Sequence, residues 1–223
     1  MNIRKAVAVR RWAVLVALWI VATPQAADLK DAKIQAKLAR GEIVIELKRE
    51  PGTHVVVGTA TGVIDAPREQ VWAVIGDFNH FTEFMPSFKT SFMLKPDVMT
   101  SLDSTRSLKN QEPLLSANKL DRAASDTLLL YHCFNFPFPL GDRRCLLRMV
   151  RDGVNYYSHY DLVMGDFKID EGSWQLSPYG DKTLAIYITR SDPGLAVPGF
   201  LLRIGTRHIL PDVIQGVRKR VKG

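Results

Sequence analysis

Residues 64–78, Ile-Asp-Ala-Pro-Arg-Glu-Gln-Val-Trp-Ala-Val-Ile-Gly-Asp-Phe, hold the junction between a strand and a helix that decides the fold. The residues just before it, 54–64, are rich in Val and Thr and predict a strand. Asp65 suits a helix cap, and Pro67 suits the first helical turn. The apolar residues that follow repeat at helical spacing, and Asp77 then begins a second short helix. The stretch therefore predicts one strand followed by two short helices.

Strand signals dominate on both sides of this junction. Alternating or β-branched sequence predicts strands at 42–48, 54–64, 88–95, 98–109, 125–134, 143–151, 154–162, 169–177 and 182–191. Turn residues separate most of them, as at Pro51-Gly52, Asp152-Gly153, Glu171-Gly172 and Pro178 to Asp181. Short strands joined by such turns predict a large antiparallel sheet built from hairpins.

The last part of the chain changes period. After Pro198, apolar residues recur at helical spacing as far as Val217, and Pro211 inside this stretch predicts a kink or a split. A curved sheet needs one face covered, and a long apolar helix can cover it. No repeat or linker divides the chain, so we expect one domain at 41–223 after a short amphipathic helix within 27–40. The expected class is α+β, a curved antiparallel sheet wrapped around a long C-terminal helix.

Residues 1–26 have the composition of a secretory signal peptide. A basic run from Arg4 to Arg11 precedes an apolar stretch, and small residues follow around Ala26. The apolar stretch has about eleven residues, whereas a membrane-spanning helix needs roughly 20. We therefore expect a cleaved signal rather than an uncleaved anchor, and a periplasmic or otherwise exported protein. Cleavage removes four basic residues and lowers the formal charge from +7 to about +3, so the basic pI does not indicate nucleic-acid binding.

Two cysteines, Cys133 and Cys145, are the only ones in the chain. An oxidising compartment makes a disulfide between them feasible. Two small buried thiols are the other interpretation, and the sequence leaves both open. Their spacing fits no CxxC redox motif, and no companion residues suggest a zinc site. We expect neither a metal nor a cofactor.

Four segments together resemble the START-like superfamily. They are residues 64–78, Phe81-Thr-Glu-Phe84-Met-Pro86, Pro137-Phe-Pro-Leu-Gly-Asp-Arg143 and Asp192-Pro-Gly194, in that order along the chain. The superfamily includes polyketide cyclase, coenzyme Q-binding and steroidogenic lipid-transfer domains. The sequence departs from the pattern at Gly141, where Ser is usual, and at Arg144, where an acid is frequent. The resemblance spans about residues 41–220.

The resemblance implies a helix-grip fold with an elongated internal cavity. Most members of the superfamily bind sterols, phospholipids, quinones or polyketides there, and a minority are enzymes. We therefore expect a periplasmic carrier of a hydrophobic small molecule or lipid, with transient membrane contact and no nucleic-acid partner. The alternative is a cyclase or aromatase that uses Arg143, Tyr131, Tyr157 or His132 for proton transfer. Export argues against it, because polyketide assembly is cytosolic.

The candidate ligand-binding residues are mostly aromatic, because lipid cavities are lined by apolar side chains with few polar groups. Packing of the core is the competing interpretation for each of them. The candidates are Trp72, Phe78, Phe81, Phe84, Met85, Phe88, Tyr131, Phe134, Phe136, Phe138, Arg143, Tyr157, Trp174, Tyr187, Phe200 and Ile204.

The loop at 134–140 and the two arginines after it stand out among these candidates. Three aromatics and two prolines in one loop suggest a gate or a membrane contact, with plain packing as the alternative. Strand alternation sends Arg143 and Arg144 to opposite faces of the sheet. Arg143, which holds the arginine position of the family, is expected to face the cavity. There it would pair with a ligand head group or with an acid such as Asp142 or Asp77.

Overall fold

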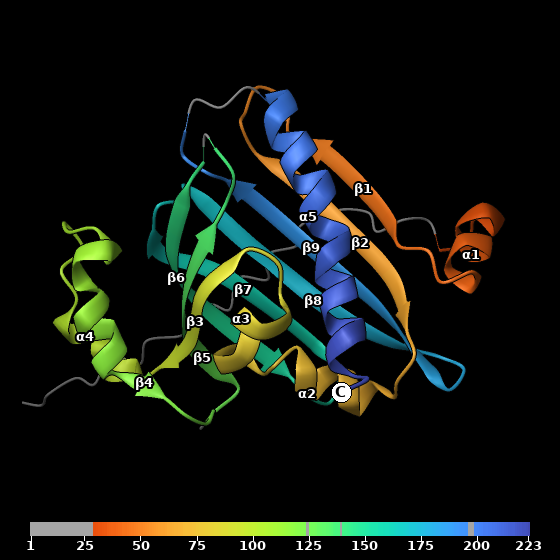
Figure 1. Ribbon diagram of the computed structural model, residues 1–223, viewed down its shortest axis with the longest axis horizontal. Helices are drawn as coiled ribbons and strands as arrows, with labels where there is room; N and C mark the ends of the chain where they lie inside the picture. Colours follow the sequence, from red (N-terminus) through yellow and green to blue (C-terminus); the bar gives the residue numbers. More distant parts are fainter. Residues whose placement is uncertain (1–28, 124, 139, 196–198) are drawn as a thin grey trace, which may run out of the picture.

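One antiparallel sheet carries the fold. The computed structural model describes residues 29–123, 125–138, 140–195 and 199–223, and for residues 199–206 and 208 it describes the backbone alone. The expected signal peptide lies outside this range. Within it, nine strands form one sheet in the order β1-β2-β9-β8-β7-β6-β5-β3-β4 (Figure 1). The α+β class expected from the sequence is confirmed.

The elements follow the expected order with two exceptions in the middle of the chain. The strands are β1 (Val44–Arg49), β2 (Val56–Ile64), β3 (Phe88–Leu94), β4 (Lys119–Leu120), β5 (Thr127–Asn135), β6 (Asp142–Asp152), β7 (Tyr157–Gly165), β8 (Ile169–Tyr179) and β9 (Lys182–Asp192). The helices are α1 (Ala32–Ala39), α2 (Arg68–Val74), α3 (Phe81–Phe84), α4 (Glu112–Ala117) and α5 (Gly199–Arg220), with 3-10 helices η1 (Phe78–His80), η2 (Pro96–Ser101) and η3 (Leu108–Gln111).

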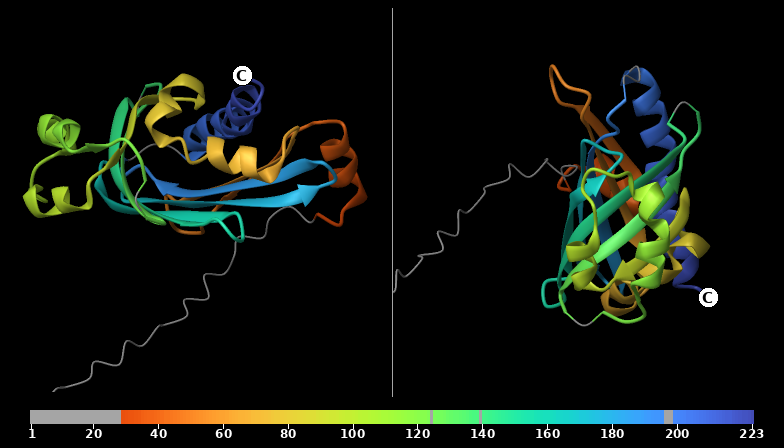
Figure 2. Two further views of the ribbon diagram at one scale, coloured as in Figure 1. Left: turned by 90° about the horizontal axis from the view of Figure 1, so that it is seen from below. Right: turned by 90° about the vertical axis from the view of Figure 1, so that its left-hand side faces the viewer.

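Three helices cover one face of the sheet. Figure 2 shows α2, α3 and α5 on the same side of the strands, with α1 and α4 at opposite ends. The described part of α5 buries Leu210, Val213, Ile214 and Val217 beneath it. The helix runs through Pro211 without a break, so the expected split is wrong. Among the described residues, no helix has both the length and the apolar character that crossing a membrane requires.

The segment expected as a strand at 98–109 is instead part of a helical cover. It contributes η2 and η3, and together with α4 it packs on the outer face of β3, β5 and β6 (Figure 2). Buried Gln111 holds the loop in place of a strand ladder, since its side chain accepts from the Asp103 amide and donates to the carbonyls of Asp103 and Arg106. Val98 and Leu108 belong to the apolar residues whose spacing suggested a strand. They are buried in the hydrophobic cluster on this outer face, the outer core. The two-residue strand β4 was not expected.

The two cysteines lie on neighbouring strands but face opposite sides of the sheet. His132 is paired with Cys145, and Cys133 with Arg144, so the cysteines are offset by one residue. Because side chains alternate along a strand, Cys133 packs in the outer core and Cys145 in the inner one. Both are free and buried. The interpretation as buried thiols is therefore the one that the structure supports, and the disulfide is not formed.

One of the two turns expected near β8 is wrong, because Glu171 and Gly172 lie within this strand. The turn expected at Pro178 to Asp181 is confirmed in its second half, since β8 ends at Tyr179 and β9 begins at Lys182. Gly180 lies in this turn, and its φ of 62° suits a glycine.

The C-terminal half of α5 is anchored by polar contacts. The guanidinium of Arg218 donates to the carbonyl of Val63 and to that of Gly41. Arg220 forms ion pairs with Asp77 and Glu83. These bonds hold this end of the helix against β2, η1 and α3.

Gly216 lets α5 approach α3 closely, and we expect Gly216→Ala to destabilise the protein. A Cβ at this position would overlap the carbonyl oxygen of Phe84. Alanine favours a helix more than glycine does, by about 1 kcal/mol, but overpacking against backbone costs about 1–3 kcal/mol. The free energy of unfolding from urea titration should therefore fall.

The neighbouring Gln215→Ala serves as the control, because Gln215 is exposed on the same turn. It should leave the free energy of unfolding within about 0.5 kcal/mol of the wild type. Equal stability of Gly216→Ala and wild type would contradict the close contact between α5 and α3.

Candidate functional site

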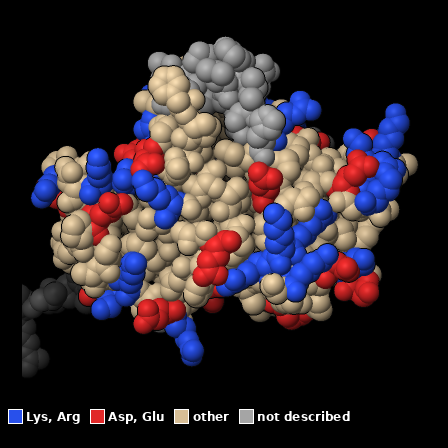
Figure 3. All heavy atoms as spheres, viewed as in Figure 1, with Lys and Arg blue, Asp and Glu red and all other residues tan. Residues whose placement is uncertain are grey.

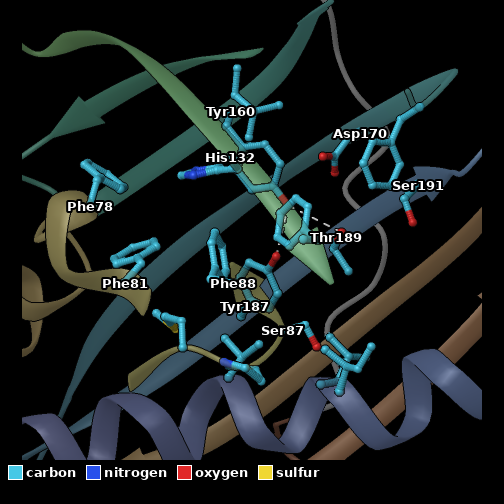
Figure 4. A pocket seen from close by; sticks show the side chains of 18 of the residues that line it. Phe78, Phe81, Ser87, Phe88, His132, Tyr160, Asp170, Tyr187, Thr189 and Ser191 are labelled. Carbon is cyan, nitrogen blue, oxygen red and sulfur yellow. Dashed lines mark hydrogen bonds between the residues drawn. The ribbon is translucent and has the colours of Figure 1, made fainter. Parts of the chain in front are cut away.

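A cavity of about 170 Å³ lies between α5 and the inner face of the sheet. Strands β3 and β5 to β9 contribute to its wall, together with η1, α3 and α5. Its lining residues are Phe78, Phe81, Met85, Pro86, Ser87, Phe88, His132, Phe134, Phe136, Leu147, Met149, Tyr160, Phe167, Asp170, Trp174, Tyr187, Thr189, Ser191, Ile209, Leu210 and Val213. Figure 4 shows a close view of this wall, with α5 along one side.

One part of the wall is made of stacked aromatic rings. The imidazole of His132 lies parallel to the ring of Phe81, with centroids 6.1 Å apart, and meets Phe88 edge-on at 5.0 Å. Burial lowers the pKa of His132 to about 3, so the imidazole is neutral at physiological pH. Its Nδ1 atom has no hydrogen-bond partner among the described residues. His132 therefore acts here as one more aromatic ring.

The turn between β5 and β6 lies next to the cavity. Phe136 stacks on Phe134 with centroids 5.4 Å apart, and both line the cavity. The amide of Phe136 donates to the carbonyl of Gly141, which closes the turn. At its tip, the side chain of Phe138 is 96% exposed. The turn therefore presents one phenylalanine to the cavity and another to solvent.

The opposite part of the wall is polar. The hydroxyls of Tyr160 and Tyr187 are 3.0 Å apart, and the Tyr160 hydroxyl also donates to Thr189 Oγ1 at 3.4 Å. Ser191 follows Thr189 on the same face of β9. Figure 4 shows Thr189, Ser191 and Asp170 on one side of the cavity and Phe78 and Phe81 on the other.

Asp170 is the one carboxylate among the described lining residues. Its side chain is 7% exposed, and the thiol of Cys145 lies within hydrogen-bonding reach of it. Burial raises the pKa of Asp170 to about 7, although the Cys145 thiol opposes the shift. The same burial raises the pKa of Tyr187 to about 12. Near neutral pH, Asp170 thus exchanges between a carboxylate and a protonated acid that can donate a hydrogen bond.

Gly172 gives the Tyr160 ring its room. This glycine lies in the middle of β8, directly across from Tyr160 on β7. A Cβ there would lie 2.6 Å from the Tyr160 hydroxyl oxygen. The absence of a side chain lets the ring extend across β8 and reach Tyr187 and Thr189 on β9.

Half of the sequence-predicted residues line the cavity. These are Phe78, Phe81, Met85, Phe88, Phe134, Phe136, Trp174 and Tyr187. Six others do not, namely Trp72, Phe84, Tyr131, Phe138, Arg143 and Tyr157. The side chains of Phe200 and Ile204 lie outside the described part of the structure.

Five of these six have evident structural surroundings. The ring of Trp72 stacks under the guanidinium of Arg151, and Phe84 packs against Phe81. Tyr131 is buried in the outer core. Tyr157 is exposed, and Phe138 lies at the tip of its turn.

The arginine pair divides between the faces as strand alternation predicts. Arg144 faces outward, with its Nε atom 3.3 Å from Glu112 and its Nη2 atom 3.7 Å from Asp142. Arg143 makes no ion pair within the described residues, and its buried Nε atom has no hydrogen-bond partner there. The expected pairing of Arg143 with Asp142 or Asp77 is therefore wrong, since Arg144 and Arg220 hold those carboxylates.

Sequence reasoning missed the polar side of the wall. It singled out Trp174 and Tyr187 but not Asp170, Thr189 or Ser191. These three lie two or four residues along the same strands, and side chains at even spacing share a face. Extending the alternation from Trp174 and Tyr187 would have found them.

Among the described residues, no three His, Cys, Asp or Glu side chains gather in a way that could hold a metal ion. The site is thus an apolar cavity with one hydroxyl-rich and carboxyl-bearing side.

Comparisons with known proteins bear on this geometry. Among solved structures, a STAR-related lipid transfer protein from Xanthomonas axonopodis matches with a TM-score of 0.60 and 15% identity, covering 81% of this chain and 94% of that one. The Zhui aromatase/cyclase from Streptomyces sp. R1128 matches with a TM-score of 0.57 and 11% identity, covering 76% and 94%. A START superfamily protein from Mycobacterium smegmatis has a TM-score of 0.55 and 15% identity, covering 74% and 97%. At these identities the likeness shows the fold.

The sequence comparison shows the family. No curated protein matches the chain significantly. A family model described as polyketide cyclase / dehydrase and lipid transport matches residues 64–218, well over half of the chain. The chain therefore belongs to this START-like family, and its hydrophobic cavity is that of a ligand-binding helix-grip fold.

Proposed function

We propose that this protein is an exported carrier that binds a hydrophobic ligand in the cavity between α5 and the sheet. The observation that supports this most directly is the cavity itself, an unfilled apolar space in the middle of a close-packed core. Protein interiors are usually packed as densely as organic crystals, and an unfilled space loses van der Waals contacts. Such a space lowers the stability of the fold, and a ligand-binding function would explain why it is present. Burial of apolar ligand surface, worth about 25 cal/mol per Å², would supply most of the affinity.

The size of the cavity limits what it holds. Its 170 Å³ compares with roughly 150 Å³ for an engineered cavity that takes up benzene, and with about 300–1,000 Å³ for the sites of drug-sized ligands. A cavity of this volume therefore accommodates a single ring or a short chain. A lipid, sterol or quinone requires that the wall open, or that only one end of the ligand enter.

The turn between β5 and β6 is the proposed opening and membrane contact. It places Phe136 on the cavity wall and Phe138 in solvent. In both figures of the ribbon, this turn and the N-terminal end of α5 lie at the same end of the molecule (Figures 1 and 2). The C-terminal half of α5 is anchored by Arg218 and Arg220, so movement is easier at the opposite end of the helix. An exposed phenylalanine beside a cavity mouth suits brief insertion into a lipid surface.

The location outside the cytoplasm rests on the sequence of residues 1–26, with its basic, apolar and small-residue segments. Electrostatics give no support to a nucleic-acid partner. On the face seen in Figure 3, most Lys and Arg side chains lie near Asp or Glu side chains, between larger areas of other residues. Near the C-terminus, Arg218 donates to a backbone carbonyl and Arg220 pairs with a carboxylate.

The cyclase alternative finds less support in the geometry. Of its four candidate residues, only His132 lines the cavity, and burial holds the pKa of that imidazole at about 3. A group with so low a pKa is a poor proton acceptor near neutral pH.

Filling the cavity should abolish binding without unfolding the protein. Val213→Phe enlarges a side chain of α5 that lines the cavity. The added ring has space to occupy, so the free energy of unfolding should change by less than about 1 kcal/mol. The affinity for toluene, measured by NMR titration, should fall at least about tenfold, because the substituted ring takes the place of the ligand.

Val217→Phe is the matched control, one turn further along α5 and buried outside the cavity. There the same change overpacks a filled core and should cost about 1–3 kcal/mol. If both variants were destabilised equally, or if Val213→Phe bound toluene like the wild type, the cavity would not be the binding site.

Replacing the exposed phenylalanine should weaken membrane contact. Phe138→Ser removes the apolar tip of the turn, and binding to vesicles of phosphatidylethanolamine and phosphatidylglycerol should fall roughly three- to tenfold in a co-sedimentation assay. Val154→Ser provides the comparison, because Val154 is 87% exposed in the turn at the other end of β6. Equal losses for the two variants, or none for Phe138→Ser, would exclude the turn as the contact.

A further inference from the structure

The cavity has a polar side that hydrophobic packing does not require. Asp170, Thr189 and Ser191 face a space whose remaining wall is largely aromatic and aliphatic (Figure 4). A buried carboxyl without a full set of hydrogen-bond partners costs folding free energy. The Cys145 thiol is a weak donor and satisfies only part of its capacity. Among the described residues, that thiol is the one side-chain hydrogen-bond partner of the Asp170 carboxyl.

Three hydroxyls lie beside Asp170. The Tyr160 hydroxyl is in hydrogen-bonding contact with Tyr187 and Thr189, and Thr189 is also within hydrogen-bonding reach of Tyr187. A hydroxyl proton rotates to suit its acceptor, so any of the three can turn from a neighbouring hydroxyl to a ligand oxygen. The Tyr187 ring is held in place by Trp174, with centroids 4.8 Å apart, so the hydroxyls are fixed before any ligand arrives.

The charges around the cavity decide which ligands fit this polar side. Among the described residues that line it, none is Lys or Arg. His132 is neutral, because burial lowers its pKa to about 3. An anionic head group would meet no positive partner among the described lining residues, and burying an unpaired anion is very costly. A cationic head group would meet one carboxyl alone, and a buried pair of that kind seldom recovers the cost of removing both charges from water.

We propose that the polar side of the cavity, formed by Asp170 and the Tyr160–Tyr187–Thr189 hydroxyls, is a subsite for an uncharged ligand group that ends in a carbonyl or hydroxyl oxygen. This inference rests on the proposed ligand-binding function and specifies its ligand class. The oxygen accepts a hydrogen bond from the protonated acid or from one of these hydroxyls, while the apolar remainder of the ligand packs among the phenylalanines. Free fatty acids and other anionic amphiphiles are excluded at this end.

The protonation of Asp170 couples this binding to pH. The titratable groups around it are Cys145 on β6, Tyr160 on β7, Tyr187 on β9 and Glu171 on its own strand. The described cavity-lining residues of α5, namely Ile209, Leu210 and Val213, carry no charge. Below its pKa of about 7 the acid has an O–H to donate, and above it the carboxylate repels a ligand oxygen. Affinity for a ligand that only accepts hydrogen bonds should therefore fall as the pH rises through 7.

Four probes of nearly one shape test the subsite. Acetophenone ends in a neutral carbonyl, α-methylstyrene replaces that oxygen by carbon, benzoate is an anion and α-methylbenzylamine is a cation at pH 6. NMR titration of the purified protein at pH 6 should show acetophenone binding roughly tenfold more tightly than each of the other three, as one hydrogen bond in a buried site would give. Between pH 5.5 and 8.5 its affinity should decline several-fold, and that of α-methylstyrene should stay constant.

Variants of the acid separate its roles. Asp170→Asn keeps a hydrogen-bond donor and removes the titration, so the preference for acetophenone should persist and its pH dependence should vanish. Asp170→Leu removes the donor and should lose most of the preference, and Tyr187→Phe should reduce it. Tyr157→Phe is the control, since that tyrosine lies on β7 with Tyr160 but is exposed to solvent. Thermal melts establish that each variant is folded.

The outcomes distinguish this inference from the function beneath it. Equal affinities for acetophenone and α-methylstyrene, or preferred binding of benzoate or the amine, would overturn the neutral subsite and leave a ligand-binding cavity. Should Asp170→Leu fail to fold, the preference of Asp170→Asn and the pH profile of the wild type still decide the question. No binding of any probe by folded wild-type protein would contradict both the subsite and the proposed function.

Discussion

The packing of α5 against the inner face of the sheet is the constraint on which the rest of the structure depends. The C-terminal part of the helix packs closely against α3 and β2. Gly216 has no side chain to clash with the backbone of Phe84, and Arg218 donates to the carbonyls of Val63 and Gly41. Closer to the middle of the helix, Leu210 and Val213 line the cavity beside aromatic rings. The cavity thus forms because α5 is held against the sheet at its C-terminal end, while the sheet curves away from the rest of the helix.

The strands place chemistry in this cavity by simple alternation. Each of β7, β8 and β9 directs every second residue inward, which brings Tyr160, Asp170 and Tyr187 to one wall. Gly172 on β8 has no side chain, so the Tyr160 side chain can cross this strand. The outer face of the sheet is used differently, since η2, η3 and α4 build a second core against Tyr131 and Leu146. The sheet therefore has a filled hydrophobic core on its outer face and the cavity on its inner face.

Much of this arrangement follows from the sequence, and the exceptions have physical reasons. The junction at 64–78 predicted a strand and two helices, because a helical apolar period acts locally. Pro67 is the N-cap of α2 and not part of its first turn, so that detail of the prediction is wrong. The segment 98–109 was mistaken for a strand, since spaced apolar residues look alike whether they pair in a ladder or anchor an irregular loop through Gln111. Pro211 failed to split α5, because the helix around it is fixed by tertiary contacts of the residues that follow.

The site was only partly predictable for a similar reason. Aromatic residues signal a cavity wall, but the same residues fill cores, so Trp72 and Tyr131 could not be told from Phe88 or Tyr187 without the packing. The polar members were overlooked because a lone aspartate or threonine in a strand carries no local signal. Their meaning appears only when the register places Asp170 beside Ser191 on the inner face.

The central claim, that this cavity carries a hydrophobic ligand, is tested most directly by native mass spectrometry with lipid extraction. The protein would be purified from the envelope of its own host, without added detergent that could displace a ligand. The account predicts a stoichiometric, uncharged hydrophobic molecule bound to the protein. A clean mass of the protein alone, still unoccupied after incubation with envelope lipids, would contradict it.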